Sequence, residues 1–396
     1  MRRVRPASFG AEPAGARLAR ILNSPNYDPA AGAFRNPLPA AIGPQPGGGS
    51  RGEMIRALLR REGRKPAGPV PVQRPDLSAP PAGGLRLTWL GHATVLAEID
   101  GRRVLFDPVF GERCSPFSFA GPRRFHRVPL PLGELGPLDA VVISHDHYDH
   151  LDMPTVRELR KAVAPDVLFA VPLGVGAHLE SWGVPQDRIA ELDWHESAEV
   201  AGLTLTATPA RHFCGRGIRN KQRTLWASWS VRGSEHRVFH SGDTGYFPGF
   251  ADIGAEHGPF DAAMVQIGAY SDFWPDIHMT PEEGVRAHLD LRGGVLLPIH
   301  WGTFNLAPHR WEEPAERTAA AAAAGGVRAA IPRPGEPFEP SAPTLPVTPW
   351  WQEIAAPERS PQPGGSGSRP AEAAAPAPVV APVKQAPAKP SPATEG

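Results

Sequence analysis

A stretch of nine residues, 144–152, combines three histidines with three aspartates and is the part of the chain best suited to metal chemistry. It directly follows the apolar run 138–143, whose β-branched residues indicate a buried strand. The histidines are therefore expected on a loop at the carboxyl end of a strand, where α/β folds place their chemistry. Imidazole and carboxylate groups are ligands that zinc prefers, whereas ordinary exposed turns favour Gly, Asn, Pro and Ser. Because one ion takes about four donors, this density predicts part of a two-metal site.

Three further donors, His212, Asp243 and His300, each come shortly after an apolar, strand-like run. A single histidine in that position is more often structural than a metal ligand. Three such donors, added to the pattern His145-x-His147-x-Asp149-His150, supply enough groups to complete two metal shells. Nearby glycines, among them Gly242, allow the backbone to approach such a site closely.

The elements that must position these residues alternate between strand-like and helix-like patterns. The sequence predicts strands at 85–90, 93–99, 103–106, 138–143, 167–171, 203–208, 225–231, 236–240, 262–267 and 294–299. It predicts helices at 154–163, 174–182, 281–290 and 313–324. Asp100-Gly101 is a strong hairpin turn signal between two of the strands. Strands mixed with helices at this rhythm predict a layered α/β domain over residues 85–335.

Three further segments flank this domain. Residues 1–66 are expected to be an N-terminal extension that carries a short basic amphipathic helix at 54–61. Packing of this helix on the main domain is favoured, and contact with a membrane surface is the alternative. Residues 67–84 are a Pro/Ala-rich linker. Residues 336–396 are Pro/Ala-rich and are expected to be a disordered tail, because they contain too few apolar residues to offset the entropy of ordering.

Composition narrows the classes of function. The formal net charge is zero, and no basic stripe interleaved with aromatic residues is apparent, so nucleic acid is not an expected partner. Two distant cysteines, Cys114 and Cys214, do not form a disulfide framework and are typical of a reducing compartment. Neither a secretory signal nor an apolar stretch long enough to span a bilayer is apparent. We expect a cytoplasmic protein, with peripheral membrane contact as a possibility.

The full donor pattern resembles the metallo-β-lactamase superfamily over residues 85–335. Within it, Trp89-Leu90-Gly91-His92-Ala93-Thr94, Phe106-Asp107-Pro108-Val109-Phe110, Gly121-Pro122-Arg123-Arg124-Phe125 and Ser241-Gly242-Asp243-Thr244-Gly245-Tyr246 are similar to the branch that contains N-acyl-phosphatidylethanolamine-hydrolysing phospholipase D. The resemblance implies an α/β fold, a four-layer αβ/βα sandwich with the site at one edge of its two sheets.

The resemblance also implies a role for each candidate residue. His145, His147 and His212 would bind one zinc ion, Asp149, His150 and His300 would bind a second, and Asp243 would bridge them. Two Zn²⁺ are the expected cofactors, with Mn²⁺ or Fe²⁺ as alternatives. Asp107 would buttress the metal loop, and His278 would face the substrate. His92 and His240 are expected to support the site without binding metal, and Asp146 is expected to turn away from it.

Two ions of this kind hold a shared water as hydroxide near neutral pH and stabilise charge on a phosphodiester. The expected function is therefore a dinuclear zinc phosphodiesterase with Asp149, Asp243 and His278 as catalytic residues. Its substrate would be a small molecule or a phospholipid. Five aromatic residues are candidates to line an apolar groove beside the metals: Trp226, Trp229, Phe247, Phe273 and Trp274. A lactonase, a β-lactamase-like enzyme, a di-iron redox protein and a non-catalytic metal-binding scaffold remain alternatives, because one fold hosts many functions.

Overall fold

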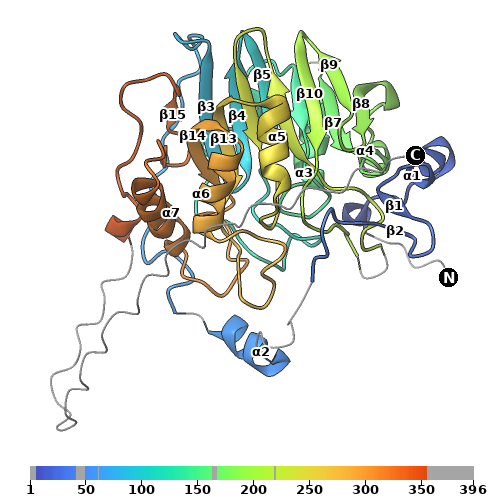
Figure 1. The fold of residues 1–396 in the computed structure, drawn as a ribbon, viewed down its shortest axis with the longest axis horizontal. Coiled ribbons are helices and arrows are strands. Elements are labelled where there is room, and N and C mark those ends of the chain that lie inside the picture. The colour runs from blue at the N-terminus through green and yellow to red at the C-terminus, as the bar shows by residue number, and fades with distance from the viewer. Residues whose placement is uncertain (1–5, 42–49, 61, 163–166, 218–219, 355–396) are drawn as a thin grey trace, which may run out of the picture. The chain divides into compact units, whose positions relative to one another are not determined.

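Two mixed β-sheets form the centre of the computed structural model, which describes residues 6–41, 50–60, 62–162, 167–217 and 220–354 (Figure 1). The seven-stranded sheet has the order β15-β3-β4-β5-β6-β7-β8, and the six-stranded sheet has the order β14-β13-β12-β11-β10-β9. The first comprises β3 (Leu85–Gly91), β4 (Thr94–Ile99), β5 (Arg102–Phe106), β6 (Ala140–Val142), β7 (Leu168–Pro172), β8 (Ile189–Leu192) and β15 (Pro337–Phe338). The second comprises β9 (Ser197–Val200), β10 (Leu203–Thr208), β11 (Ser228–Arg232), β12 (Arg237–His240), β13 (Phe260–Gln266) and β14 (Gly293–Ile299).

Side chains that alternate along each strand divide the hydrophobic residues into layers. Val104 and Phe106 of β5 point into a core shared by both sheets, whereas Leu105 between them packs in a second core. That second core contains residues of α3 (Met153–Ala162) and α4 (Gly176–Ser181). A third core covers the other sheet with residues of α5 (Gly249–His257), α6 (Pro281–Asp290) and α7 (Glu313–Ala324). The order helix, sheet, sheet, helix confirms the predicted four-layer αβ/βα sandwich.

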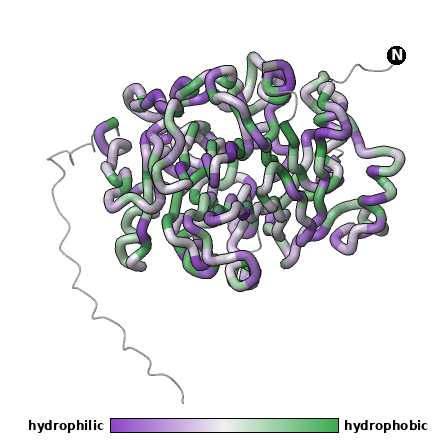
Figure 2. The backbone as a smooth tube through the Cα atoms, turned by 90° about the horizontal axis from the view of Figure 1, so that it is seen from above, coloured by the Kyte–Doolittle hydropathy of each residue, from purple (hydrophilic) through white to green (hydrophobic). Residues whose placement is uncertain are grey.

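The figures show the same layering. Helices α5 and α6 cross the face of the sheets that is turned toward the viewer in Figure 1. Figure 2 shows hydrophobic stretches running through the interior, with hydrophilic stretches at many of the outer turns. None of the helices among the described residues is both long and apolar enough to cross a lipid bilayer.

Strand direction brings the candidate site residues to one edge of the sandwich. Strands β5 and β6 are parallel, as are β12, β13 and β14, and β10 runs in the direction of β12 because β11 is antiparallel to both. Asp107, the 144–152 loop, His212, Asp243 and His300 all follow the carboxyl ends of these strands. Three of the strand-end residues, His92, Asp107 and His300, have positive φ angles of 54°, 39° and 68°. Strained backbone of this kind is common at functional sites.

The ends of the domain differ from the prediction. Residues 336–354 are not a disordered tail: Phe338 pairs with Leu87 in the seven-stranded sheet, and Trp350 and Trp351 are each 1% exposed in the core between the sheets. The composition suggested disorder, but two tryptophans bury enough apolar surface to order a Pro-rich segment. The rest of the predicted tail, 355–396, lies outside the described residues. The sequence also did not predict α5 or the edge strands β8 and β9.

The N-terminal extension has two dissimilar parts. Residues 6–41 contain α1 (Gly15–Leu22) and a small hairpin of β1 (Tyr27–Asp28) and β2 (Ala33–Phe34), and their Ile21 and Phe34 are buried in the core between the sheets. The basic helix is α2 (Arg51–Leu59), which begins with a capping box between Ser50 and Glu53. None of its residues is buried, so the expected packing on the main domain is not observed.

Candidate metal centre

Two groups of potential ligand atoms lie side by side at the strand ends. In each group the atoms are within 4.8 Å of one another; the first contains His145, His147, His212 and Asp243, and the second contains His92, Asp149, His150 and His300. The structure thus brings together all seven residues that the sequence predicted as ligands. It adds His92, which had been expected to play only a supporting part.

The first group shows how hydrogen bonds outside the cluster orient its rings. His212 Nδ1 donates to the carbonyl oxygen of Ile277 at 2.9 Å, so its Nε2 carries the free lone pair. Ser144 Oγ donates to Asp107 at 2.6 Å and therefore accepts from His145 Nδ1 at 2.9 Å, which leaves His145 Nε2 unprotonated as well. Both Nε2 atoms face His147 Nδ1, at 3.3 Å from His212 and 2.8 Å from His145. One proton on His147 cannot satisfy both lone pairs fully, whereas a cation among the three nitrogens can.

Asp243 lies between the two groups. Its Oδ2 atom is 3.9 Å from His145 Nε2 and 3.7 Å from His212 Nε2 on one side, and 3.2 Å from His150 Nε2 on the other. Its Oδ1 atom is 3.1 Å from His300 Nε2. Asp243 follows Gly242, where a Cβ atom would be 2.6 Å from the Cβ of Ser144. A glycine is therefore required for the two metal loops to approach each other.

The second group is arranged around the carboxylate of Asp149. Asp149 Oδ2 is 3.0 Å from His92 Nε2, 3.2 Å from His300 Nε2 and 3.6 Å from His150 Nε2. The buried Nε2 atom of His150 makes no hydrogen bond within the described part of the chain. Unsatisfied polar atoms are rare in protein interiors, and a metal ion is one accepted explanation for them. Both groups therefore fit a divalent cation.

Asp107 holds the 144–152 loop in place through hydrogen bonds. It accepts hydrogen bonds from the Ser144 backbone N–H at 2.7 Å and from His150 Nδ1 at 2.7 Å. This is the buttressing position that the sequence resemblance implied. A carboxylate that accepts from the far nitrogen of a histidine fixes the tautomer and makes the near nitrogen a better metal ligand.

The electrostatics of the cluster also suit a cation. Burial lowers the pKa of His145, His147 and His212, which keeps these imidazoles in the neutral form that binds metal. Burial also acts to lower the pKa of His150 and His300, but the carboxylates of Asp243 and Asp149 outweigh it and raise both pKa values. The negative charge around His150 and His300 therefore favours a positive charge at this position, and a bound metal ion supplies one.

Asp146 turns away from the cluster, as predicted. Its Oδ1 atom accepts from the Gly215 backbone N–H at 2.7 Å, and its Oδ2 atom lies 3.0 Å from Thr224 Oγ1. His240 also has a structural role, because its ring stacks on Phe106 and its Nε2 atom is 3.0 Å from the carbonyl oxygen of Ala93.

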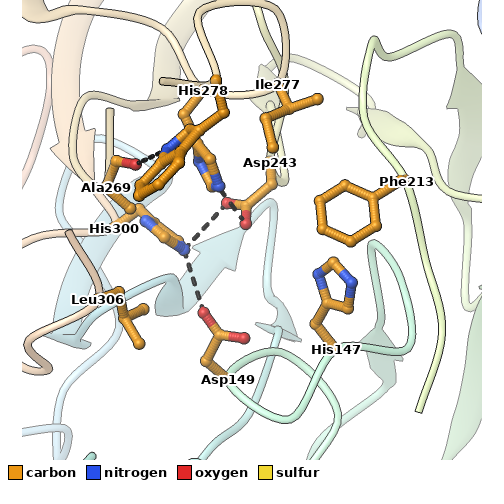
Figure 3. A pocket seen from close by; sticks show the side chains of 10 residues that line it. His147, Asp149, Phe213, Asp243, Ala269, Ile277, His278, His300 and Leu306 are labelled. Atoms are coloured by element: carbon orange, nitrogen blue, oxygen red, sulfur yellow. Dashed lines mark hydrogen bonds and ion pairs between the residues drawn. The ribbon is translucent and has the colours of Figure 1, made fainter. Parts of the chain in front are cut away.

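A pocket of about 310 Å³ opens above both groups (Figure 3). His147, Asp149, Asp243 and His300 form its polar floor, and its walls are formed by His278 together with the apolar side chains of Phe213, Trp274, Ile277 and Leu306. Of the aromatic residues predicted to line such a groove, only Trp274 does so. Trp226, Trp229 and Phe247 are buried in the hydrophobic cores, and Phe273 is not part of the lining.

His278 faces this pocket, with its Nδ1 atom 4.0 Å from Asp243 Oδ2. Burial lowers its pKa to about 4, although the Asp243 carboxylate acts in the opposite direction. The side chain is therefore a neutral imidazole at neutral pH. It follows Ile277, whose carbonyl orients His212, so the same short segment contributes to the pocket and to the first ligand group.

A sandwich of this kind, with histidine and aspartate clusters at its strand ends, defines a metal-dependent hydrolase of the metallo-β-lactamase fold. Residues 102–301 match the family described as the β-lactamase superfamily domain, and the chain belongs to that superfamily. It is 51% identical over 351 residues to an uncharacterized protein of Mycobacterium tuberculosis, a match that covers 88% of this chain and 92% of that protein.

Two further comparisons extend the family assignment. The chain is 41% identical over 231 residues to N-acyl-phosphatidylethanolamine-hydrolyzing phospholipase D 1 of Caenorhabditis elegans, which covers 56% of this chain and 65% of that protein. The solved structure of Igni18, a metallo hydrolase from the archaeon Ignicoccus hospitalis, aligns with a TM-score of 0.50 and 23% identity over 64% of this chain and 98% of that one. At that identity the likeness shows the fold alone.

Proposed function

We propose that the protein is a dinuclear zinc phosphodiesterase that acts on a phospholipid of the N-acyl-phosphatidylethanolamine type. The observation that carries this proposal is the pocket, where two adjacent ligand groups form the floor and apolar side chains form the walls. A phosphodiester needs positive charge beside its oxygens, and an acyl chain needs apolar surface nearby. The relative from Caenorhabditis elegans is named for hydrolysis of such a lipid, which supports this choice of substrate class.

The residues divide into two binding sites and a shared bridge. His145, His147 and His212 would hold one zinc ion, Asp149, His150 and His300 would hold the second, and Asp243 would contact both. When bound, the two ions supply an acidified water as the nucleophile and fixed positive charge for the phosphodiester oxygens. Asp149 and Asp243 contribute negative charge that keeps the ions in place, and Asp107 orients His150.

His278 is assigned to orient the substrate. A neutral imidazole donates one hydrogen bond and accepts another, and the position of His278 at the pocket wall directs it toward a phosphate held over the floor. Because burial keeps the pKa of His278 near 4, the side chain does not carry a second proton at neutral pH. Protonation of the departing alkoxide is therefore not assigned to it.

We also propose peripheral membrane contact through α2. Ile55 and Leu59 on this helix are 53% and 71% exposed, and Arg51, Arg56 and Arg60 lie in or next to the same short element. Exposed apolar residues beside arginines are typical of helices that lie at the surface of an anionic bilayer. Such contact would place the pocket near a phospholipid, and we propose a cytoplasmic location.

One panel of substrates tests both proposals. The zinc-loaded protein is assayed on N-acyl-phosphatidylethanolamine in vesicles, dissolved bis-nitrophenyl phosphate, a lactone and a cephalosporin, with Asp243→Asn as the inactive control. We expect turnover of the two phosphodiesters, and turnover of only the lactone or the cephalosporin would refute the assignment. We expect Leu59→Ser to slow cleavage in vesicles and to leave bis-nitrophenyl phosphate cleavage unchanged. Equal rates on vesicles would refute the membrane contact.

A further inference from the structure

Residues 6–41, which we call the N-terminal strap, precede the matched superfamily region yet contact the loops of the metal centre. The strap is anchored by Ile21 and Phe34, which are buried in the core between the sheets. It is further fixed by Asn26, whose Nδ2 atom donates to Asp193 Oδ1 at 2.8 Å. Because these residues fix the strap, its other residues can hold the loops of the metal centre in position.

The main contact is a pair of hydrogen bonds between Asn36 and His212. The His212 backbone N–H donates to Asn36 Oδ1 at 2.8 Å, and Asn36 Nδ2 donates to the His212 carbonyl oxygen at 2.7 Å. The ring of the same histidine donates to the Ile277 carbonyl oxygen. Asn36 thus fixes the backbone of His212, and Ile277 fixes its ring. The two hydrogen bonds to the backbone depend on a single residue of the strap.

The strap continues along the same side of the site. Arg211, next to His212, donates to the Pro39 carbonyl oxygen and forms an ion pair with Asp276 at 2.7 Å. The Ala41 backbone N–H donates to Asp276 Oδ2 at 3.0 Å. Asp276 directly precedes Ile277 and His278, so these contacts link the strap to the segment that orients His212 and lines the pocket.

The start of the strap supports the 144–152 loop. Arg216 is 2% exposed; its Nε atom donates to the Ser8 carbonyl oxygen at 2.9 Å, and its Nη1 atom donates to the carbonyl oxygens of Asp146 and Leu151 at 2.6 and 2.8 Å. The Ala11 backbone N–H donates to His178 Nδ1 at 3.2 Å, which leaves His178 Nε2 to donate to Asp146 Oδ2 at 3.3 Å. Both routes end on Asp146 or Leu151, which are direct chain neighbours of predicted ligands.

We propose that the N-terminal strap is a positioning element of the metal centre and that Asn36 is the positioning residue for His212. The inference rests on the proposed role of His212 as a ligand of the first ion. Outer contacts that orient ligands change metal affinity by about 10–100-fold when they are removed. Loss of the Asn36 amide should therefore weaken the ion held by His145, His147 and His212 by about 10-fold.

The experiment compares Asn36→Ala with the matched control Asn26→Ala. Both variants remove a half-buried asparagine of the strap that donates a hydrogen bond, but only Asn36 contacts a metal loop. Zinc affinity is measured by competition with a chelator, and the visible absorption spectrum of the cobalt-substituted protein reports ligand geometry. We expect Asn36→Ala to lose zinc at a free-zinc concentration about 10-fold higher than the wild type does and to change the cobalt spectrum. Asn26→Ala should match the wild type in both measurements.

Two further variants separate the possible failures. Asn36→Asp keeps the acceptor for the His212 N–H, so its zinc affinity should lie between those of Asn36→Ala and the wild type. If Asn36→Ala does not fold, Asn36→Asp is compared with the wild type instead. Equal zinc affinity in Asn36→Ala, Asn36→Asp and the wild type would overturn the inference, whatever happens to the melting temperature. His212→Ala tests whether His212 is a ligand. If this variant keeps both ions at wild-type affinity, the ligand role of His212 is wrong. If His212→Ala loses zinc but the Asn36 variants do not, only the positioning role of the strap is rejected.

Discussion

The rings of the metal centre are oriented mainly by hydrogen bonds to neighbouring residues. Asp107 and Ser144 decide which nitrogen of His145 and His150 carries the proton, and the Ile277 carbonyl does the same for His212. None of these three neighbours is a candidate ligand. The chemistry of each histidine is therefore set by groups that a search for metal-binding patterns would pass over.

A substitution of His278 tests whether this residue orients the substrate or binds metal. His278 lies near Asp243 and His300, but each ligand group has four donors without it, so His278→Ala should retain metal. Loss of a positioned hydrogen bond to the phosphodiester should lower kcat/KM by about 10²-fold. His278→Gln, which can still donate one hydrogen bond, should be less impaired. Metal content is measured by elemental analysis and turnover by steady-state kinetics; metal loss in His278→Ala would show that this residue belongs to the ligand set.

His92 shows where sequence reasoning stopped short. It follows β3 just as His300 follows β14, so the strand-end criterion applied to His212 and His300 would have identified it. We expected it instead to support the site without binding metal. In the structure its Nε2 atom contacts Asp149, and its ring lies 4.0 Å from that of His300.

The secondary-structure elements could be predicted where local signals agree with tertiary packing. Helices α6 and α7 were predicted with the bounds that the structure has, because α6 starts with a capping box between Thr280 and Glu283 and α7 is rich in alanine. Helix α5 was missed because Gly249 and Gly254 lower its helix propensity. Gly254 is required there, since a Cβ atom would be 2.2 Å from the Asp290 carbonyl oxygen. The edge strands β8 and β9 are half-exposed and lack a clear apolar pattern.

Helix α6 also contains a histidine that should make stability depend on pH. His288 is 1% exposed, and burial lowers its pKa from 6.5 to about 4. The unfolded chain therefore binds a proton between pH 6.5 and 4 that the folded protein does not, so the free energy of unfolding falls as the pH decreases through this window. The loss at pH 4 should be on the order of 3 kcal/mol.

His288→Gln removes this titration without adding a charge. We expect the difference in unfolding free energy between the variant and the wild type to be constant above pH 7. Below pH 6.5 it should shift in favour of the variant, measured by urea denaturation at a series of pH values. Parallel curves for the two proteins down to pH 4 would contradict the assignment.

At the scale of the whole molecule, residues outside the superfamily match complete the domain. Trp301, next to His300, stacks on Trp89 at 5.3 Å and on Trp350 at 5.4 Å between ring centroids, and Trp351 packs against its edge at 5.8 Å. This arrangement could not be predicted from local sequence patterns, because the contacts join segments of unlike composition. The aromatic pair Trp350-Trp351 in a Pro-rich segment was the available signal.

This packing predicts how far the domain extends. A chain ended after residue 335 lacks Phe338, Trp350 and Trp351, and it should be less stable than a chain ended after residue 356 by more than ~5 kcal/mol, which approaches the total stability of many domains. Trp350→Ala in the full chain should cost about 3–5 kcal/mol. Chemical denaturation followed by circular dichroism measures both. Equal stability of the two shortened chains would show that the domain ends at residue 335, as the sequence alone predicts.

The contact between Asn36 and His212 joins residues 176 positions apart, and the tryptophans that pack beside His300 lie later still. During synthesis the strap is therefore made long before its partners, and the last supporting residues are among the final parts of the domain to appear. Contacts this distant form late, since closing a long loop precedes any gain from them. A newly made chain should consequently acquire its metal only after translation of the domain is complete.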